Sequence, residues 1–407
     1  MLKYFISIFF AFPIFLSSLI SLYFIDYPDE FKRTPYILIG IAIALFVFDI
    51  LLHQKKNLPS FAFKGLEWRT LQLAQILGYI IVSLCLLDLV THGLVILSPN
   101  PMAYFTFTPF EHHLRHFSSL VWILAPLAFF IKSKLNRTLF FISAFLFPVL
   151  FLDRNRLLLS LFAMGLTLLL FDKYAKNKFF IVAVSTLVAI GGPVAFSLLG
   201  TQRVQQANAQ EDYLADRNEQ INKMQIQNQS LINSCPVPRR IPLNDHFTKL
   251  SGFMRWTALY ISSPVFNLAT VDFCDFRNSE IFKSQILPYY QPIHIIENVP
   301  FVAPYLNTAT ELLPFQTLGG WALSIFIFIL TYFILFFLIQ KLVSQFDIFY
   351  YLIFLRIAYC AVFFNFAPQF YTWSTFGFVF VMLALKLING YIRQAYPLQI
   401  EVPYGSK

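Results

Sequence analysis

The sequence predicts an all-α polytopic membrane protein with about ten transmembrane helices and one large loop outside the membrane between helices 7 and 8. Composition gives the first reason, because 57% of the 407 residues are hydrophobic and only 13% are charged, far from the composition of a soluble domain. Segment length gives the second. A bilayer core of about 30 Å needs about 20 apolar residues per helical crossing, and ten segments meet that need within normal tolerance.

Short connections separate the predicted spans, except for one long connection after the seventh. The spans are 4–25, 36–53, 71–97, 117–131, 138–152, 155–171, 179–199, 317–340, 348–367 and 373–392. No small-residue cleavage site follows the first apolar run, so we expect a retained helix and not a signal peptide. The chain therefore divides into helices 1–7 (1–199), a large loop (200–316), helices 8–10 (317–392) and a tail (393–407).

The distribution of Lys and Arg predicts the orientation. Loops after even-numbered helices, together with the tail, carry fourteen of these residues, whereas the short loops on the other side carry five. Because short cytoplasmic loops are enriched in Lys and Arg, both termini are predicted to be cytoplasmic and 200–315 to lie outside, which in a bacterial inner membrane is the periplasm. Nucleic acid is not an expected partner, since nine Lys and Arg in that loop are offset by ten Asp and Glu.

The large loop has three parts with different composition. Residues 201–233 are polar and rich in Gln and Asn, as expected of a solvated helix. Residues 250–273 are apolar but are broken by Pro264, which favours an interfacial or re-entrant helix over a crossing. Cys235 and Cys274 both lie in the loop, where an oxidising periplasm would allow either a disulfide or two thiols. No metal-ligand spacing or Gly-rich phosphate loop occurs, so neither a metal nor a cofactor is expected.

Four arginines are predicted to lie at external helix mouths or on the re-entrant segment: Arg115, Arg154, Arg156 and Arg255. A single arginine at such a rim is usually a membrane anchor, with its stem in lipid and its head among the phosphates. Several planar guanidiniums around one cavity instead favour binding of a pyrophosphate carried on a lipid. Asp153 is predicted to pair with one guanidinium and orient the other.

Two helices carry ionisable residues at membrane depth. Arg356 lies near the middle of the span 348–367, where a charge facing lipid would cost about 2.5–3.5 kcal/mol, so it must face the bundle. It is expected to pair with Asp88 or another buried polar group, or to take part in catalysis. Asp88 and His92 are spaced i,i+4 on one helix face and are predicted to form an internal polar pair, structural or functional.

A general base needs a pKa near neutrality and hydrogen-bond reach to its hydroxyl. We expect His294 or Glu311 to fill this role, and His294 lies in "YYQPIHIIENVPF", whose apolar and aromatic residues resemble a surface for stacking sugars. Other external titratable residues are Glu111, His112, His113, His116 and His246.

The order of these parts resembles the Wzy-type polymerases of O-antigen or capsule repeat units. The likeness rests on "DRNRLLLSLFAMGLTLLLF", "RWTALYISSPVFNL", "LNTATELLPFQTLGGWALSIFIF" and "FFNFAPQF", and covers roughly 115–390 in layout. In "PFQTLGGWA" the chain departs from the family, because Gln316 and Thr317 stand where an acidic residue commonly precedes the glycine.

The resemblance implies a C-type glycosyltransferase relative that works in the periplasm without nucleotide sugar or metal. Its substrates would be undecaprenyl-pyrophosphate-linked oligosaccharides, with a flippase and a chain-length regulator as partners. Arginines at a dry helix mouth would stabilise the leaving pyrophosphate. Arg154, Arg156 and Arg255 are expected on the pyrophosphates and Arg115 on a donor or acceptor phosphate.

Three alternatives stay open from the sequence. An O-antigen ligase would share the architecture and the donor. A lipid-linked oligosaccharide flippase or other transporter would need a polar central path and usually has inverted repeats. A membrane O-acyltransferase would receive its donor from the cytoplasm, where no buried histidine stands out.

Overall fold

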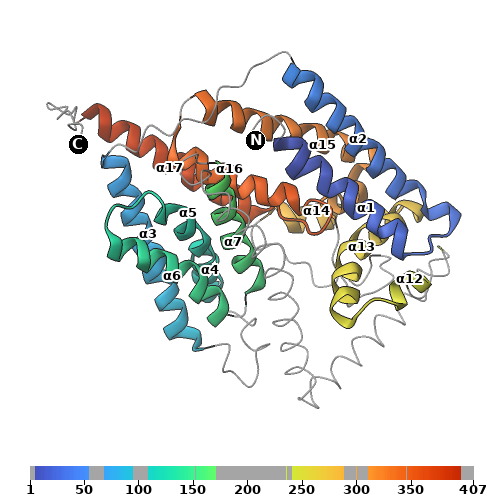
Figure 1. The fold of residues 1–407 in the computed structure, drawn as a ribbon, viewed down its shortest axis with the longest axis horizontal. Helices are drawn as coiled ribbons and strands as arrows, with labels where there is room; N and C mark the ends of the chain where they lie inside the picture. The colour runs from blue at the N-terminus through green and yellow to red at the C-terminus, as the bar shows by residue number, and fades with distance from the viewer. Residues whose placement is uncertain are drawn as a thin grey trace.

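The described chain is helical, as predicted. The structure is a computed structural model and describes residues 5–54, 68–94, 109–151, 153–170, 235, 241–287, 299, 310–344 and 346–395. Within these ranges no strand forms, and the β-type pairing is a single isolated bridge between Ile25 and Leu243. Figure 1 shows the helices packed side by side.

The principal helices, in chain order, are α1 (Phe12–Phe24), α2 (Arg33–Gln54), α3 (Trp68–His92), α4 (Pro109–Ser118), α5 (Leu124–Ala128), α6 (Lys134–Leu150), α7 (Arg154–Leu170), α12 (Asp245–Thr248), α13 (Gly252–Phe273), α14 (Ser279–Ile286), α15 (Leu313–Ser344), α16 (Ile348–Val362) and α17 (Trp373–Ala395). A π-helical turn, Ser7–Ala11, precedes α1, and two 3-10 turns, Asp29–Phe31 and Ser119–Ile123, precede α2 and α5.

Among the described residues, five helices are long and apolar enough to cross a membrane. They are Ser7–Phe24, Asp29–Leu51, Arg69–His92, Leu313–Ser344 and Trp373–Ile392. Two shorter apolar helices, Asn155–Leu170 and Ile348–Val362, match two further predicted spans. The predicted span 179–199 and the predicted polar helix 201–233 lie outside the described residues.

The helices form two groups joined by α16 (Figure 1). One group contains α3 to α7, and the other contains α1, α2, α13 and α15. Helix α16 packs against α7 on one side and against α15 on the other. Aromatic rings fill the junction: the Phe162 centroid lies 6.1 Å from that of Phe9 and 5.6 Å from that of Tyr359.

The predicted span 117–131 is helical but is not one regular α-helix. The segment is the end of α4, a 3-10 turn over Ser119–Ile123 and the five-residue α5. Pro126 explains the break, since a proline ring clashes with the carbonyl four residues earlier in an α-helix and has no N–H to donate to it. The segment packs against α3, α6 and α7, and Trp122 is only 2% exposed. Burial among these helices therefore stabilises the irregular helical geometry.

The predicted interruption of 250–273 at Pro264 is also wrong. Helix α13 is continuous from Gly252 to Phe273, with Pro264 inside it. An interior proline costs about 3 kcal/mol in an isolated helix, but tertiary burial offsets that cost here. Phe266 is fully buried, and Ser21 of α1 donates a hydrogen bond of 3.0 Å to the Ser262 carbonyl.

Segments predicted to share one side of the membrane contact one another. On the predicted external side, the Glu311 N–H donates to the Phe364 carbonyl at 2.8 Å, just beyond the C-terminus of α16. On the predicted cytoplasmic side, the rings of Phe130 and Phe346 lie 5.9 Å apart, just before its N-terminus. The two contacts are therefore separated by the length of α16, about 22 Å for fifteen residues.

A disulfide joins Cys235 to Cys274, which decides between the two possibilities left by the sequence. The bridge closes a segment of 39 residues onto the C-terminal end of α13. The bridge removes loop-closure entropy from the unfolded chain, and for a segment of this length that stabilises the folded protein by about 4 kcal/mol.

We expect mass spectrometry under non-reducing conditions to find the peptides of Cys235 and Cys274 linked. Reduction should lower the melting temperature of the purified protein, because the unfolded chain regains the entropy that the bridge removes. A Cys235→Ser, Cys274→Ser double variant is the control, and its melting temperature should not respond to reductant. Two alkylated thiols in protein from an oxidising periplasm would contradict the bridge.

Candidate functional site

Two of the predicted arginines meet at the N-terminus of α7. Arg115 lies in the last turn of α4 and Arg156 lies in the first turn of α7. Both guanidiniums lie over the ring of Phe151, at 4.8 and 5.7 Å from its centroid. The predicted clustering of these two residues, far apart in the chain, is thus found in the structure.

Asp153 fixes the start of α7 and the position of Arg156. Its Oδ1 accepts a hydrogen bond of 3.1 Å from the Arg156 backbone N–H, which caps an otherwise unpaired donor of the first turn. Its Oδ2 lies 2.7 Å from the Arg156 Nε. The predicted pairing of Asp153 with one guanidinium is therefore confirmed, and Asp153 contacts both the backbone and the side chain of the same residue.

The rest of the Arg156 guanidinium holds the C-terminal end of α4. Nη1 donates to the Ser118 hydroxyl at 3.1 Å and Nη2 to the Arg115 carbonyl at 3.0 Å. The last carbonyls of a helix lack partners within it and carry partial negative charge, so a cation is well placed there. Arg156 is 5% exposed, and each guanidinium nitrogen has a partner within the protein. We conclude that Arg156 positions α4.

The predicted pair of Asp88 and His92 is confirmed and belongs to the same cluster. His92 Nδ1 lies 2.7 Å from Asp88 Oδ1, while the other carboxylate oxygen accepts from the Ser118 hydroxyl and lies 3.4 Å from Arg115 Nη1. Asp88 is fully buried. Of the two partners suggested for Arg356, Asp88 is not the one found, because it bonds to residues of α3 and α4, whereas another buried polar group, Thr375, is.

Burial and a neighbouring cation both act on Arg115. Removal from water and the positive charge of Arg156 lower the pKa of its guanidinium, Asp153 and Asp88 raise it, and the net result is a pKa of about 9. Arg115 remains a cation at neutral pH, but in surroundings that disfavour its charge. A phosphate oxygen bound beside Arg115 would offset the free-energy cost of keeping this cation away from water. A cation of this kind is expected at an anion-binding site.

A pair of amides lies on the other side of the α7 terminus. Asn155, between the two arginines of "DRNR", accepts a hydrogen bond of 2.6 Å from the Tyr359 hydroxyl of α16 through its Oδ1. The Gln369 Nε2 lies 3.4 Å from the same oxygen. Asn155 is exposed and Gln369 is partly exposed. The sequence analysis missed both, although the position of Asn155 within the charged motif was a signal.

Glu311 is held in a cradle of four donors. One oxygen accepts from the backbone N–H groups of Gln369 and Phe370, and the other from the Tyr371 N–H at 2.8 Å and the Gln285 Nε2 at 3.0 Å. Burial raises the pKa of this carboxyl and the backbone donors lower it, with a net rise from 4.5 to about 7. Because protein donors engage both carboxylate oxygens, Glu311 is suited to anchoring the 369–371 segment, and a substrate hydroxyl finds no vacant acceptor position on it.

Arg356 faces the bundle, as predicted. Its Nε and Nη2 donate to the Thr375 hydroxyl at 3.2 and 3.1 Å, and that hydroxyl donates to the Gln369 carbonyl at 2.7 Å. Its positive charge also lowers the pKa of Glu311. Arg356 therefore supports the segment that carries Gln369, near the predicted external end of α16 and not near the cytoplasmic end.

A carboxylate does occur beside the Gly319–Gly320 break, although the local sequence has none. Asp272 of α13 accepts hydrogen bonds from Gln316 Nε2 at 2.9 Å and from Trp321 Nε1 at 2.8 Å. Gly320 has φ of +62°, which favours glycine, and α15 is non-helical at both glycines. The acidic group thus comes from a distant helix.

Among the described residues, the third predicted arginine is not brought to the arginine pair. Arg255 of α13 is exposed and donates to the Thr248 carbonyl of α12. Arg154 begins α7, but its side chain is outside the described part of the chain, and so is His294. The other external histidines that are described differ in their surroundings: His113 and His116 are exposed, and His246 stacks on Tyr23 at 4.9 Å.

Within the described ranges no group of three or more His, Cys, Asp or Glu side chains is arranged to hold a metal ion. Comparison of the chain with protein-family models, with curated proteins and with solved structures found no match.

Proposed function

We propose that this protein polymerises undecaprenyl-pyrophosphate-linked oligosaccharide repeat units into O-antigen or capsular polysaccharide, at the periplasmic face of the bacterial inner membrane. The observation that carries the proposal is the pair of guanidiniums over Phe151 at the mouth of α7, that of the buried Arg156 and that of the partly buried Arg115. Both belong to segments that the Lys and Arg bias predicts to be external.

The reaction needs a charged leaving group to be stabilised. The bond between the anomeric carbon of the growing chain and the pyrophosphate oxygen breaks, and its electron pair leaves with the pyrophosphate. The acceptor hydroxyl forms the new glycosidic bond and loses its proton. Arg115, a cation in a desolvated site, is placed to stabilise the developing negative charge, and Arg156 holds it there through the end of α4.

The amide pair supports a saccharide beside the pyrophosphate. Asn155 and Arg156 are consecutive at the start of α7, so the amides and the guanidiniums lie at the same end of this helix, and a sugar joined to the pyrophosphate is proposed to lie at Asn155 and Gln369. Amides both donate and accept hydrogen bonds, as sugar hydroxyls require. The Tyr359 hydroxyl fixes Asn155 Oδ1 and thereby directs its amide nitrogen away from α16.

The structure changes the roles expected from the sequence. Glu311 becomes a positioning residue, because its carboxylate is saturated by protein donors. His294 remains the proposed base. Arg255 is proposed to have no phosphate contact, since its guanidinium bonds to the α12 end. A flippase and a chain-length regulator remain the expected partners, and the protein itself would need no metal.

Deletion of the gene tests the function. We expect lipopolysaccharide on a gel to show the core carrying a single repeat unit, and the wild-type gene to restore the ladder. Bare core after deletion would instead identify a ligase. Loss of all lipid-linked repeat units from the periplasmic leaflet would identify a flippase.

The orientation has its own test. Alkaline phosphatase folds into an active enzyme in the periplasm, so fusion after Asn233 should be active and fusion after Lys176 inactive, as the Lys and Arg bias predicts. Equal expression of the two fusions by immunoblot is the control. The reverse pattern of activity would place the arginine pair in the cytoplasm and exclude the proposed reaction.

A further inference from the structure

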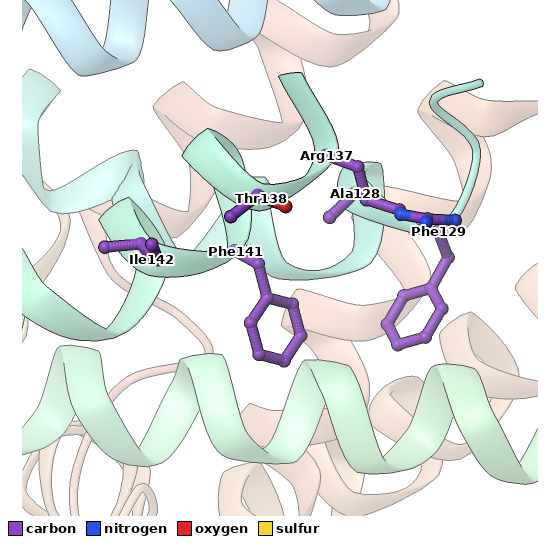
Figure 2. Close-up of a pocket in the computed structure, with 6 residues that line it drawn as sticks. All are labelled: Ala128, Phe129, Arg137, Thr138, Phe141 and Ile142. Atoms are coloured by element: carbon purple, nitrogen blue, oxygen red, sulfur yellow. The ribbon is translucent and has the colours of Figure 1, made fainter. Parts of the chain in front are cut away.

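A cavity lies between the end of α5 and the first two turns of α6, away from the arginine pair of α4 and α7. Its volume is about 330 Å³. Figure 2 shows the residues that line it: Ala128, Phe129, Arg137, Thr138, Phe141 and Ile142. None of them has a part in the proposed polymerase reaction.

The lining changes from polar to apolar along α6. Arg137 and Thr138 lie in the first turns of the helix, and Phe141 and Ile142 lie one turn further along. In Figure 2 the Arg137 side chain extends toward Phe129, and the Phe141 and Phe129 rings project on the same side. A molecule that fits this order has a charged end and an apolar end aligned with the helix.

Charge in this part of the chain has one sign. Lys132, Lys134 and Arg137 fall within six residues, and no acidic residue occurs from 124 to 150. Arg137 and Thr138 are both exposed, and within the described chain neither the Arg137 guanidinium nor the Thr138 hydroxyl has a hydrogen bond or ion pair with another side chain. Two polar groups at the mouth of the cavity are thus available to a ligand, and the ligand would be an anion.

The outer surface of α6 indicates where that ligand comes from. Leu135, Ile142 and Leu146 are 77%, 53% and 47% exposed, as expected of a helix whose surface meets lipid. The N-terminus of α6 is predicted to lie at the cytoplasmic surface, and the contact of Phe130 with Phe346 groups it with the other predicted cytoplasmic turn. The charged end of the cavity would therefore lie at headgroup level in the cytoplasmic leaflet.

We propose that this cavity binds one anionic phospholipid of the cytoplasmic leaflet, with its phosphate at Arg137 and Thr138 and an acyl chain along Phe141 and Ile142. The site discriminates by charge, because a zwitterionic lipid carries a cation that three nearby basic residues repel. It also requires the acyl chain, since most of the lining is apolar.

Native mass spectrometry of the full-length protein in detergent tests the proposal with phosphatidylglycerol, phosphatidylcholine and inorganic phosphate as probes. We expect one phosphatidylglycerol to be retained, about fivefold more than phosphatidylcholine, and no retention of phosphate. Arg137→Gln should reduce phosphatidylglycerol retention about fivefold. Lys341→Gln is the matched control, because Lys341 is exposed near the same predicted surface and lies against Phe337 instead of the cavity.

Thr138→Phe provides a second variant that keeps every charge but fills the cavity. It should abolish retention of both lipids, while its melting temperature shows that the protein is folded. Equal retention of the two lipids by the wild-type protein would overturn the proposal. So would equal losses in the Arg137→Gln and Lys341→Gln variants, which would indicate a diffuse basic surface, or normal retention by Thr138→Phe.

Discussion

Replacing Arg115 by lysine is expected to reduce polymer synthesis by about a hundred- to thousand-fold, although one positive charge is exchanged for another. Lysine lacks the planar fork that binds phosphate oxygens bidentately, and it loses the contact with the Phe151 ring. Loss of one donor to developing charge in a desolvated site costs about 2.7–4 kcal/mol. The measurement is the amount and length of polymer in a deletion strain carrying the variant, normalised to protein level.

Arg255→Lys is the matched control for that experiment. The sequence placed Arg255 with the other arginines, but its exposed guanidinium bonds to the Thr248 carbonyl, so we expect normal polymer. A membrane anchor at Arg115 would tolerate lysine, whose stem also reaches the headgroups. Normal polymer from Arg115→Lys at normal abundance would therefore mean that the residue is an anchor or a structural contact, and the proposed site would be abandoned.

Replacing Glu311 by alanine is expected to give a large loss of stability. The carboxylate accepts from three backbone N–H groups, and a buried donor without an acceptor costs about 1–3 kcal/mol. The total loss should be about 3 kcal/mol or more, seen as a lower melting temperature in detergent. Glu280→Ala is the control, because Glu280 makes an exposed pair with Lys283 that contributes about 1 kcal/mol or less.

The pH dependence follows from the raised pKa of Glu311. Its pKa is 4.5 without the fold and about 7 within it, so the folded protein takes up a proton between these values. The resulting stabilisation is complete below pH 4.5 and is lost as the pH rises through 7. We therefore expect the melting-temperature gap between wild type and Glu311→Ala to be widest near pH 5 and to narrow by pH 8. A gap that widens with pH would contradict the assignment.

From the charges and the helix positions, the sequence predicted which arginines lie together but not what each of them does. Arg115 and Arg156 were predicted together because both lie at helix mouths on one predicted side, and the sign of Asp153 beside Arg156 predicted their pairing. Their different roles could not be predicted. The Arg156 guanidinium has a hydrogen-bond partner at every nitrogen only because α4 brings the Ser118 hydroxyl and the Arg115 carbonyl to it, from 38 and 41 residues away in the sequence.

The amide pair shows the same limit. Asn155 and Gln369 are separated by 214 residues and are joined because α7 and α16 pack side by side. Neither residue lies in a spacing that a helix or strand would repeat, so periodicity gives no signal. Glu311 was selected as a base because of its residue type, whereas the neighbouring backbone of 369–371 makes it an anchor.

By itself, the sequence determined that the protein is helical, that several helices are apolar enough to cross a membrane, and that Asp88 and His92 share a face. These properties depend on composition and on the local period of 3.6 residues, which any helix obeys. Tertiary structure alone decided the 3-10 turn within the helical segment 117–131, the unbroken helix through Pro264, and the carboxylate that Asp272 places beside Gly320. In each case a free energy of packing between distant segments outweighs a local preference of a few kcal/mol, and a local pattern contains no information about that packing.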